Sequence, residues 1–83
     1  MPTIEVTLSD TATGIGKVAT VTLYNYPGVA QYRLLRVDGT ALTGKVNVGS
    51  TVKVIFIQPG DQCKVELYST SGDLMETKTV TTR

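Results

Sequence analysis

The sequence contains no histidine, no tryptophan and only one cysteine among its 83 residues. Histidine is the commonest acid–base side chain and metal ligand, so its absence argues against a zinc site and against an imidazole-activated nucleophile. Seven carboxylates remain, but no spacing in the sequence pairs two of them. We therefore expect a protein that is not an enzyme and that holds neither a metal nor a cofactor.

The single cysteine, Cys63, cannot close a disulfide within the chain, which excludes a disulfide-stapled miniprotein. It occupies an alternating apolar position with Val65 and Leu67. We expect its thiol to be a small buried hydrophobic group; a reactive or intermolecular role is the alternative.

Charge of one sign is also lacking, because eight Lys and Arg side chains face seven Asp and Glu side chains and leave a net charge of +1. This balance does not predict a nucleic-acid partner. The longest apolar run, residues 54–57, is too short to cross a bilayer, so no membrane partner is predicted. Residues 1–10 show no secretory signal, and we expect cytoplasmic synthesis without a signal peptide; a virion component would look the same.

Two loop features invite a ligand-binding interpretation and do not support it. The segment 13–17, Thr-Gly-Ile-Gly-Lys, lacks the remaining positions of a phosphate-binding loop, since Thr11 stands where glycine is needed and Val18 follows the lysine. The loop aspartates are not densely spaced as in a calcium loop, and we interpret them as turn-forming residues: Asp10, Asp38, Asp61 and Asp73.

What the sequence has in excess is β-branched side chains, with fourteen threonines and eleven valines. Such side chains lose rotamer freedom in helices and pack well on a pleated sheet. Ile4, Val6 and Leu8 alternate with polar residues at the period of a half-buried strand. An all-β fold is therefore predicted.

Turn signals divide the chain into seven short segments of this kind, among them Asp38-Gly39, Pro59-Gly60 and Ser71-Gly72. This spacing predicts one domain, residues 1–83, folded as a seven-stranded antiparallel sandwich of two sheets. The expected strands are 3–8, 17–24, 29–37, 41–48, 51–58, 62–70 and 74–82.

The segment 57–67, Ile-Gln-Pro-Gly-Asp-Gln-Cys-Lys-Val-Glu-Leu, resembles the corner between the fifth and sixth strands of fibronectin type III domains. Cys63 stands where that family has a tyrosine, and no tryptophan marks the second strand. Further short likenesses follow in the same order at residues 2–6, 32–34 and 80–82. The resemblance implies an immunoglobulin-like or fibronectin type III-like sandwich, of the kind that acts as a spacer, adhesion or docking module.

Strand alternation also predicts apolar side chains on the outside. If Tyr32 and Leu34 face the core, Leu35 and Val37 point outward; if Val54 and Phe56 face the core, Ile55 and Ile57 point outward. Tyr68 points outward as well. Exposed apolar groups on a small domain indicate a partner surface, although strand twist, a bulge or the sheet ends can cover some of them. The predicted interface residues are Leu35, Val37, Ile55, Ile57 and Tyr68.

These observations favour a non-catalytic structural or docking module that binds copies of itself or a larger protein assembly. A virion decoration or tail-associated protein fits this composition by fold analogy. The alternative is a recognition or adhesion module that binds a protein or glycan through end loops at residues 9–16, 25–28 and 58–61.

Overall fold

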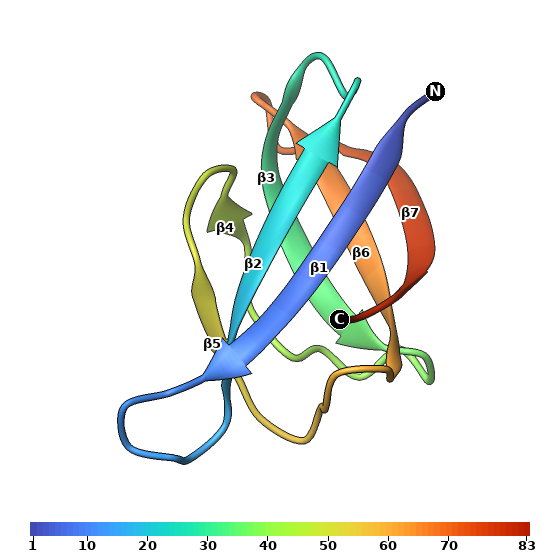
Figure 1. Ribbon diagram of the computed structural model, residues 1–83. Helices are drawn as coiled ribbons and strands as arrows, with labels where there is room; N and C mark the ends of the chain where they lie inside the picture. The colour runs from blue at the N-terminus through green and yellow to red at the C-terminus, as the bar shows by residue number, and fades with distance from the viewer.

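A computed structural model describes all residues, 1–83, and shows seven strands in two antiparallel sheets (Figure 1). One sheet has the order β1-β2-β5 and the other the order β4-β3-β6-β7. The strands are β1 (Thr3–Asp10), β2 (Lys17–Tyr24), β3 (Val29–Arg36), β4 (Val46–Asn47), β5 (Val52–Val54), β6 (Gln62–Ser69) and β7 (Leu74–Thr81). The predicted all-β, two-sheet architecture is confirmed. The structure has no long apolar helix of the kind that crosses a membrane.

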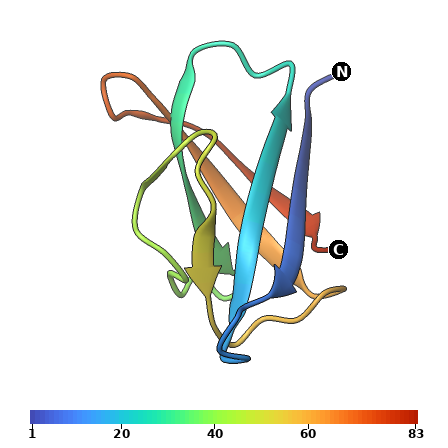
Figure 2. The same ribbon diagram turned by 60° about the vertical axis from the view of Figure 1, so that its left-hand side comes forward.

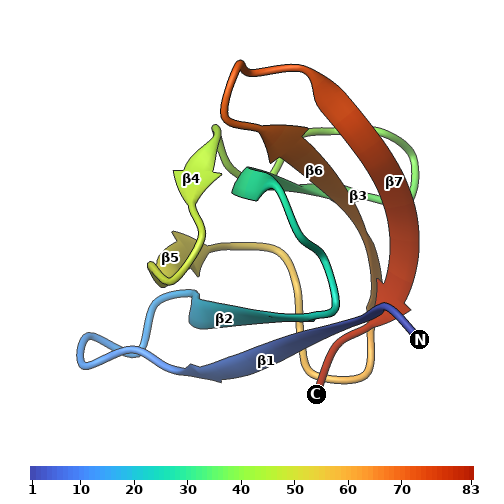
Figure 3. The same ribbon diagram turned by 90° about the horizontal axis from the view of Figure 1, so that it is seen from above.

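The two sheets lie face to face, as the views from the side and from above show (Figures 2 and 3). Strands β1 and β2 form a regular hairpin in which Thr3 lies opposite Tyr24 and Asp10 opposite Lys17. In the second sheet, β6 lies between β3 and β7. Strand β7 stays paired with β6 along its length, and its C-terminal end lies near β1 (Figure 3).

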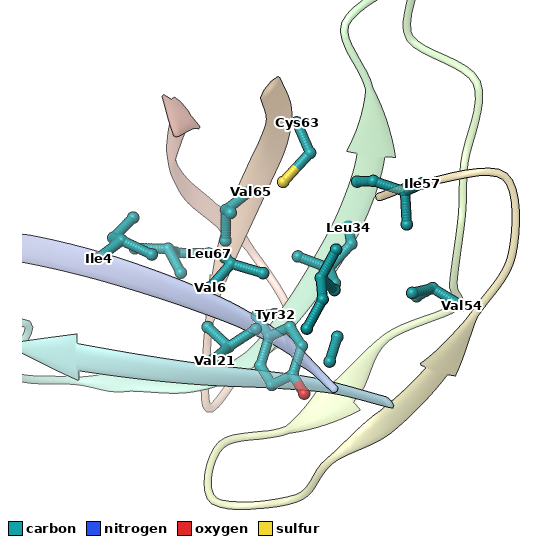
Figure 4. Packing of buried hydrophobic residues seen from close by; sticks show 12 residues of the cluster. Ile4, Val6, Val21, Tyr32, Leu34, Val54, Ile57, Cys63, Val65 and Leu67 are labelled. Carbon is teal, nitrogen blue, oxygen red and sulfur yellow. The ribbon is translucent and has the colours of Figure 1, made fainter. Parts of the chain in front are cut away.

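Apolar side chains at every second strand position fill the space between the sheets (Figure 4). Tyr32 lies at the centre, and its hydroxyl donates a 2.7 Å hydrogen bond to the carbonyl oxygen of Ser50, so its one polar atom is satisfied. Cys63 belongs to this cluster, and burial raises the pKa of its thiol to about 11. The core residues are Ile4, Val6, Leu8, Ala19, Val21, Tyr32, Leu34, Val54, Ile57, Cys63, Val65 and Leu67.

The fourth and fifth strands are much shorter than the predicted ranges 41–48 and 51–58. The Asp38-Gly39 turn forms, and the amide of Gly39 donates a hydrogen bond to the carbonyl of Arg36. After the turn, Leu35 and Ala41 form an isolated β-bridge. The amides of Leu42 and Thr43 then both donate to the carbonyl of Leu34, which breaks the ladder before β4 begins. The predicted continuous strand 41–48 is therefore wrong.

The corner between β5 and β6 is held by the C-terminal end of the chain. The buried hydroxyl of Thr82 lies 3.0 Å from the carbonyl oxygen of Gln58 and 2.9 Å from that of Asp61, and donates its proton to these two acceptors. The main chain of Thr82 also pairs with Gly60 and Asp61, and Arg83 pairs with Val6 and Leu8 of β1. This segment connects the corner to the free edge of the first sheet.

Replacing Thr82 by valine keeps the shape of the side chain and removes its hydroxyl. We expect Thr82→Val to lower the free energy of unfolding by about 1 kcal/mol, because one hydrogen-bonding hydroxyl is lost while the carbonyls of Gln58 and Asp61 keep their main-chain donors, the amides of Asp61 and Thr82. Urea denaturation followed by circular dichroism measures the change. The control is Thr81→Val, an exposed neighbour, for which a change within about 0.5 kcal/mol is expected. Equal losses in both variants would contradict the assigned role.

Candidate functional site

The structure divides the five predicted interface residues into an exposed pair and a buried set. Val37 and Ile55 are exposed, with 52% and 46% of their surface accessible. Leu35, Ile57 and Tyr68 are buried. The exposure predicted for these three residues is wrong, for two different reasons.

Ile57 is buried because the backbone of Phe56 is left-handed, with φ of 63°. Strand β5 ends at Val54, and this turn of the backbone shifts the alternation by one position. Ile57 therefore joins the core, while Phe56, which alternation places in the core, points into solvent. The prediction fails because it assumed that the strand continued to residue 58.

Leu35 and Tyr68 do lie on the outer face, since Leu34 and Leu67 next to them face the core and side chains alternate along a strand. Both are nevertheless covered. The Lys45 ammonium lies 4.3 Å from the centre of the Tyr68 ring and also donates to the carbonyl of Gly72. Lys45, from the loop between β3 and β4, thus covers the Tyr68 ring.

A polar network completes this cover. Tyr68 donates a 2.7 Å hydrogen bond to the Glu66 carboxylate, and the Arg33 guanidinium lies 2.7 Å from the same oxygen. The hydrogen bond from Tyr68, and after it the Arg33 charge, lower the pKa of Glu66. Leu35 and Tyr68 therefore serve the packing of this layer in the isolated chain.

Of the nine large apolar side chains that are exposed, four lie at the end of the sandwich formed by the loops 11–16, 37–45 and 55–61 (Figure 1), and five lie elsewhere: Met1, Tyr24, Val48, Leu74 and Met75. Phe56 is 79% exposed and Ile15 is 67% exposed, and they accompany Val37 and Ile55. We call Ile15, Val37, Ile55 and Phe56 the basal patch. Of the loops predicted as a binding surface, 9–16 and 58–61 belong to this end, whereas 25–28 lies at the opposite end.

Two hollows flank Phe56. One, of about 470 Å³, is lined by Val37, Phe56 and Ile57 together with Arg36, Asp61 and neighbouring loop atoms. The other, of about 390 Å³, is lined by Ile15, Ile55, Phe56 and Ile57 together with Lys17 and the glycines of the loop 11–16. Phe56 and Ile57 border both hollows, so the phenyl ring stands between them.

Close backbone contact holds this end of the molecule in shape. A β-carbon on Gly16 would lie 2.6 Å from the carbonyl oxygen of Val54, so only glycine lets the loop 11–16 pack against β5. On the other side of Phe56, the Asp61 carboxylate accepts a 2.9 Å hydrogen bond from the amide of Gln58. The Thr82 hydroxyl also bonds to the carbonyls of Gln58 and Asp61 in the same loop, so several hydrogen bonds hold the segment that follows Phe56.

The patch offers apolar contact with a few charges at its rim. Lys17 forms an ion pair with Asp10, and the hydrogen bond and charge of the lysine lower the pKa of this carboxyl. No group of three metal-ligating side chains comes together in the structure. The arrangement suits the binding of an apolar protuberance or surface, framed by Lys17, Arg36 and Asp61.

Comparison with protein-family models, with curated proteins and with solved structures finds no match for this chain. Sequence reasoning found Val37 and Ile55 and missed Ile15 and Phe56, which are more exposed. A usable signal existed for Ile15, an isolated isoleucine within a glycine-rich loop. None existed for Phe56, because a left-handed aromatic residue is not predicted by any local pattern.

Two glycines of the loop 11–16 provide a matched test of the contact with β5. Gly14 and Gly16 have the same positive φ, 74° and 73°, but a β-carbon on Gly14 would meet no atom. Both alanine variants should lose about 1 to 2 kcal/mol of stability through backbone strain. Gly16→Ala should lose about 1 to 3 kcal/mol more through its clash with Val54. Thermal and urea unfolding give both values, and identical losses would show that the loop does not pack as described.

Glu66 makes part of the stability dependent on pH. Because its pKa is lowered in the folded state, its contribution is present above the ordinary carboxyl value of 4.5 and is lost as the pH falls through the folded-state pKa. Glu66→Gln should therefore show a smaller loss of stability below pH 4.5 than the wild type. Urea unfolding at a series of pH values tests this. Equal losses of stability in Glu66→Gln and the wild type would show that this carboxylate does not contribute.

Proposed function

We propose that this protein is a non-catalytic docking module that attaches to a larger protein assembly through the basal patch. Three loops from both sheets present Ile15, Val37, Ile55 and Phe56 at one end of the sandwich. Apolar residues grouped in this way on a small domain are typical of a partner surface. A virion decoration or tail-associated role is a narrower form of the proposal, and is supported by composition and fold analogy alone.

The observation that carries the proposal is the state of Phe56. A bulky aromatic residue in the left-handed region costs about 1 to 2 kcal/mol, and glycine or asparagine would avoid that cost. Burial of the phenyl ring does not offset this backbone cost, because the ring is exposed. Strained residues of this kind gather at binding sites, and a buried aromatic anchor is a common source of binding energy between proteins. We infer that the ring is covered when the partner is bound.

We further propose that the sandwich is of the fibronectin type III kind. In constant-type immunoglobulin domains the fourth strand pairs with the fifth. Here β4 pairs with β3 instead, which supports the type that the Pro59-Gly60 corner resembles. Thr82 replaces the corner tyrosine in tying the β5–β6 connection down.

The alternative function, a recognition module that uses its end loops, draws on the same surface. The loops 9–16 and 58–61 border the basal patch, so a ligand bound there would also cover Phe56. The lining of both hollows is mixed, with Arg36 and Asp61 in one and Lys17 and Gln58 in the other, so it is the exposed ring of Phe56 that favours a protein partner.

Phe56→Asn tests the proposal, because asparagine tolerates the left-handed backbone while it removes the ring. We expect its free energy of unfolding to equal that of the wild type or to exceed it by about 1 kcal/mol. Tagged wild type and variant are each mixed with extract of the native source, and the captured proteins are quantified by mass spectrometry. Capture of the assembly component should fall at least tenfold with Phe56→Asn.

The control is Val48→Asn, which replaces another exposed apolar side chain in the turn between β4 and β5 at the opposite end. It should retain capture in full. If every protein captured by the wild type were also captured by Phe56→Asn, the basal patch would not be the docking surface. If Val48→Asn alone lost capture, the docking surface would lie at the opposite end of the sandwich.

A further inference from the structure

The outer edge of β7 has no strand beside it. β7 pairs with β6 on one side only, and residues 73–79 are exposed without a break. The other edges are shorter or occupied, since β4 and β5 have two and three residues and Arg83 bonds to the free side of β1. β7 therefore presents the longest free row of main-chain donors and acceptors. Such an edge is a template for another strand.

We propose that two copies of this chain pair through the outer edges of β7, antiparallel about a two-fold axis at Thr77, with Glu76 of each copy opposite Lys78 of the other. Opposite charges that face each other across two strands stabilise the pairing, and like charges oppose it. The two-fold axis makes this contact twice, so four charges are matched within three residues.

This register is the only symmetric one that pairs the charges of β7. Residues directly opposite each other in an antiparallel pair point to the same face, so a two-fold axis must pass through a residue position. An axis at Glu76 or at Lys78 would set two carboxylates or two ammonium groups against each other. An axis at Met75 or at Thr79 would leave both charges opposite uncharged residues. Charge therefore selects Thr77 as the centre.

The folded chain already places both charged residues on one face. Lys78 and Glu76 lie opposite Val65 and Leu67 of β6, which point inward, and Thr77 lies opposite Glu66 on the outer face. On this face both charged groups act on Tyr26, whose buried hydroxyl makes no hydrogen bond. Burial, and after it the Glu76 carboxylate, raise the pKa of Tyr26, whereas Lys78 lowers it.

The contact is expected to be weak, because the register of β7 shifts between its pairings with Leu67 and Tyr68. A bulge at this point increases the local twist and limits how far a second copy can follow the edge. The pair would bury less surface than a stable dimer, which needs about 800 Å² on each partner. The inference is independent of the proposed function, since no residue of the basal patch lies in β7.

Sedimentation equilibrium over a wide range of protein concentration tests the pairing. The wild type should show a reversible monomer–dimer equilibrium that weakens as salt is added. Glu76→Lys and Lys78→Glu each turn two attractive pairs into two repulsive ones, and each should weaken the dimer at least tenfold. The double exchange Glu76→Lys with Lys78→Glu restores opposite charges and should restore the dimer. Lys53→Glu, which makes the same charge change on an exposed residue of β5, should leave it unchanged.

Mixing the two single variants gives the sharpest result. Each alone opposes like charges, whereas a mixed pair sets two lysines against two glutamates. Equimolar Glu76→Lys and Lys78→Glu should therefore form a heterodimer when neither forms a homodimer. A wild type that stays monomeric at millimolar concentration, or a dimer that the charge variants leave intact, would overturn the inference. A dimer that Phe56→Asn dissociates and the β7 variants do not would place the contact at the basal patch instead.

Discussion

The left-handed backbone at Phe56 determines which side of the β5–β6 connection is core and which is surface. With this one residue turned, Ile57 enters the cluster between the sheets and the phenyl ring leaves it. The turn is stable only because its surroundings hold it, with Thr82 bonded to the carbonyls on the C-terminal side and Gly16 packed against β5 on the N-terminal side. The candidate surface thus exists because the rest of the structure stabilises a conformation that the residue itself disfavours.

How far the fold could be predicted depended on how regular each strand is. β1, β2, β3 and β6 carry alternating patterns, and β7, which does not alternate, follows the Ser71-Gly72 turn; the ranges of all five are close to the predicted ones. The predicted ranges of β4 and β5 are too long, because apolar residues continue along the sequence after the main chain has left the hydrogen-bonded sheet. The residue types Asp38-Gly39 correctly predicted a chain reversal. They did not predict that the amides of Leu42 and Thr43 would both bond to the Leu34 carbonyl, which ends the strand pairing soon after the turn.

The candidate site was harder to predict because exposure is a tertiary property. Alternation placed Leu35 and Tyr68 on the outer face, as the structure does, but it could not show that Lys45 from a distant loop would cover the Tyr68 ring. Ile15 belongs to no strand, so no period applied to it, and the period placed Phe56 in the core because the predicted strand 51–58 continued past Val54, where β5 ends. A pattern that tells which way a side chain points does not tell what else lies there.

The burial of Cys63 bears on where such a domain can work. Its thiol sits within the apolar interior, where ionisation is suppressed, and thiolate is the form that reacts with oxidants and with other disulfides. Folding therefore shields this thiol from oxidants and from other cysteines, and cross-linking through Cys63 requires the chain to open first.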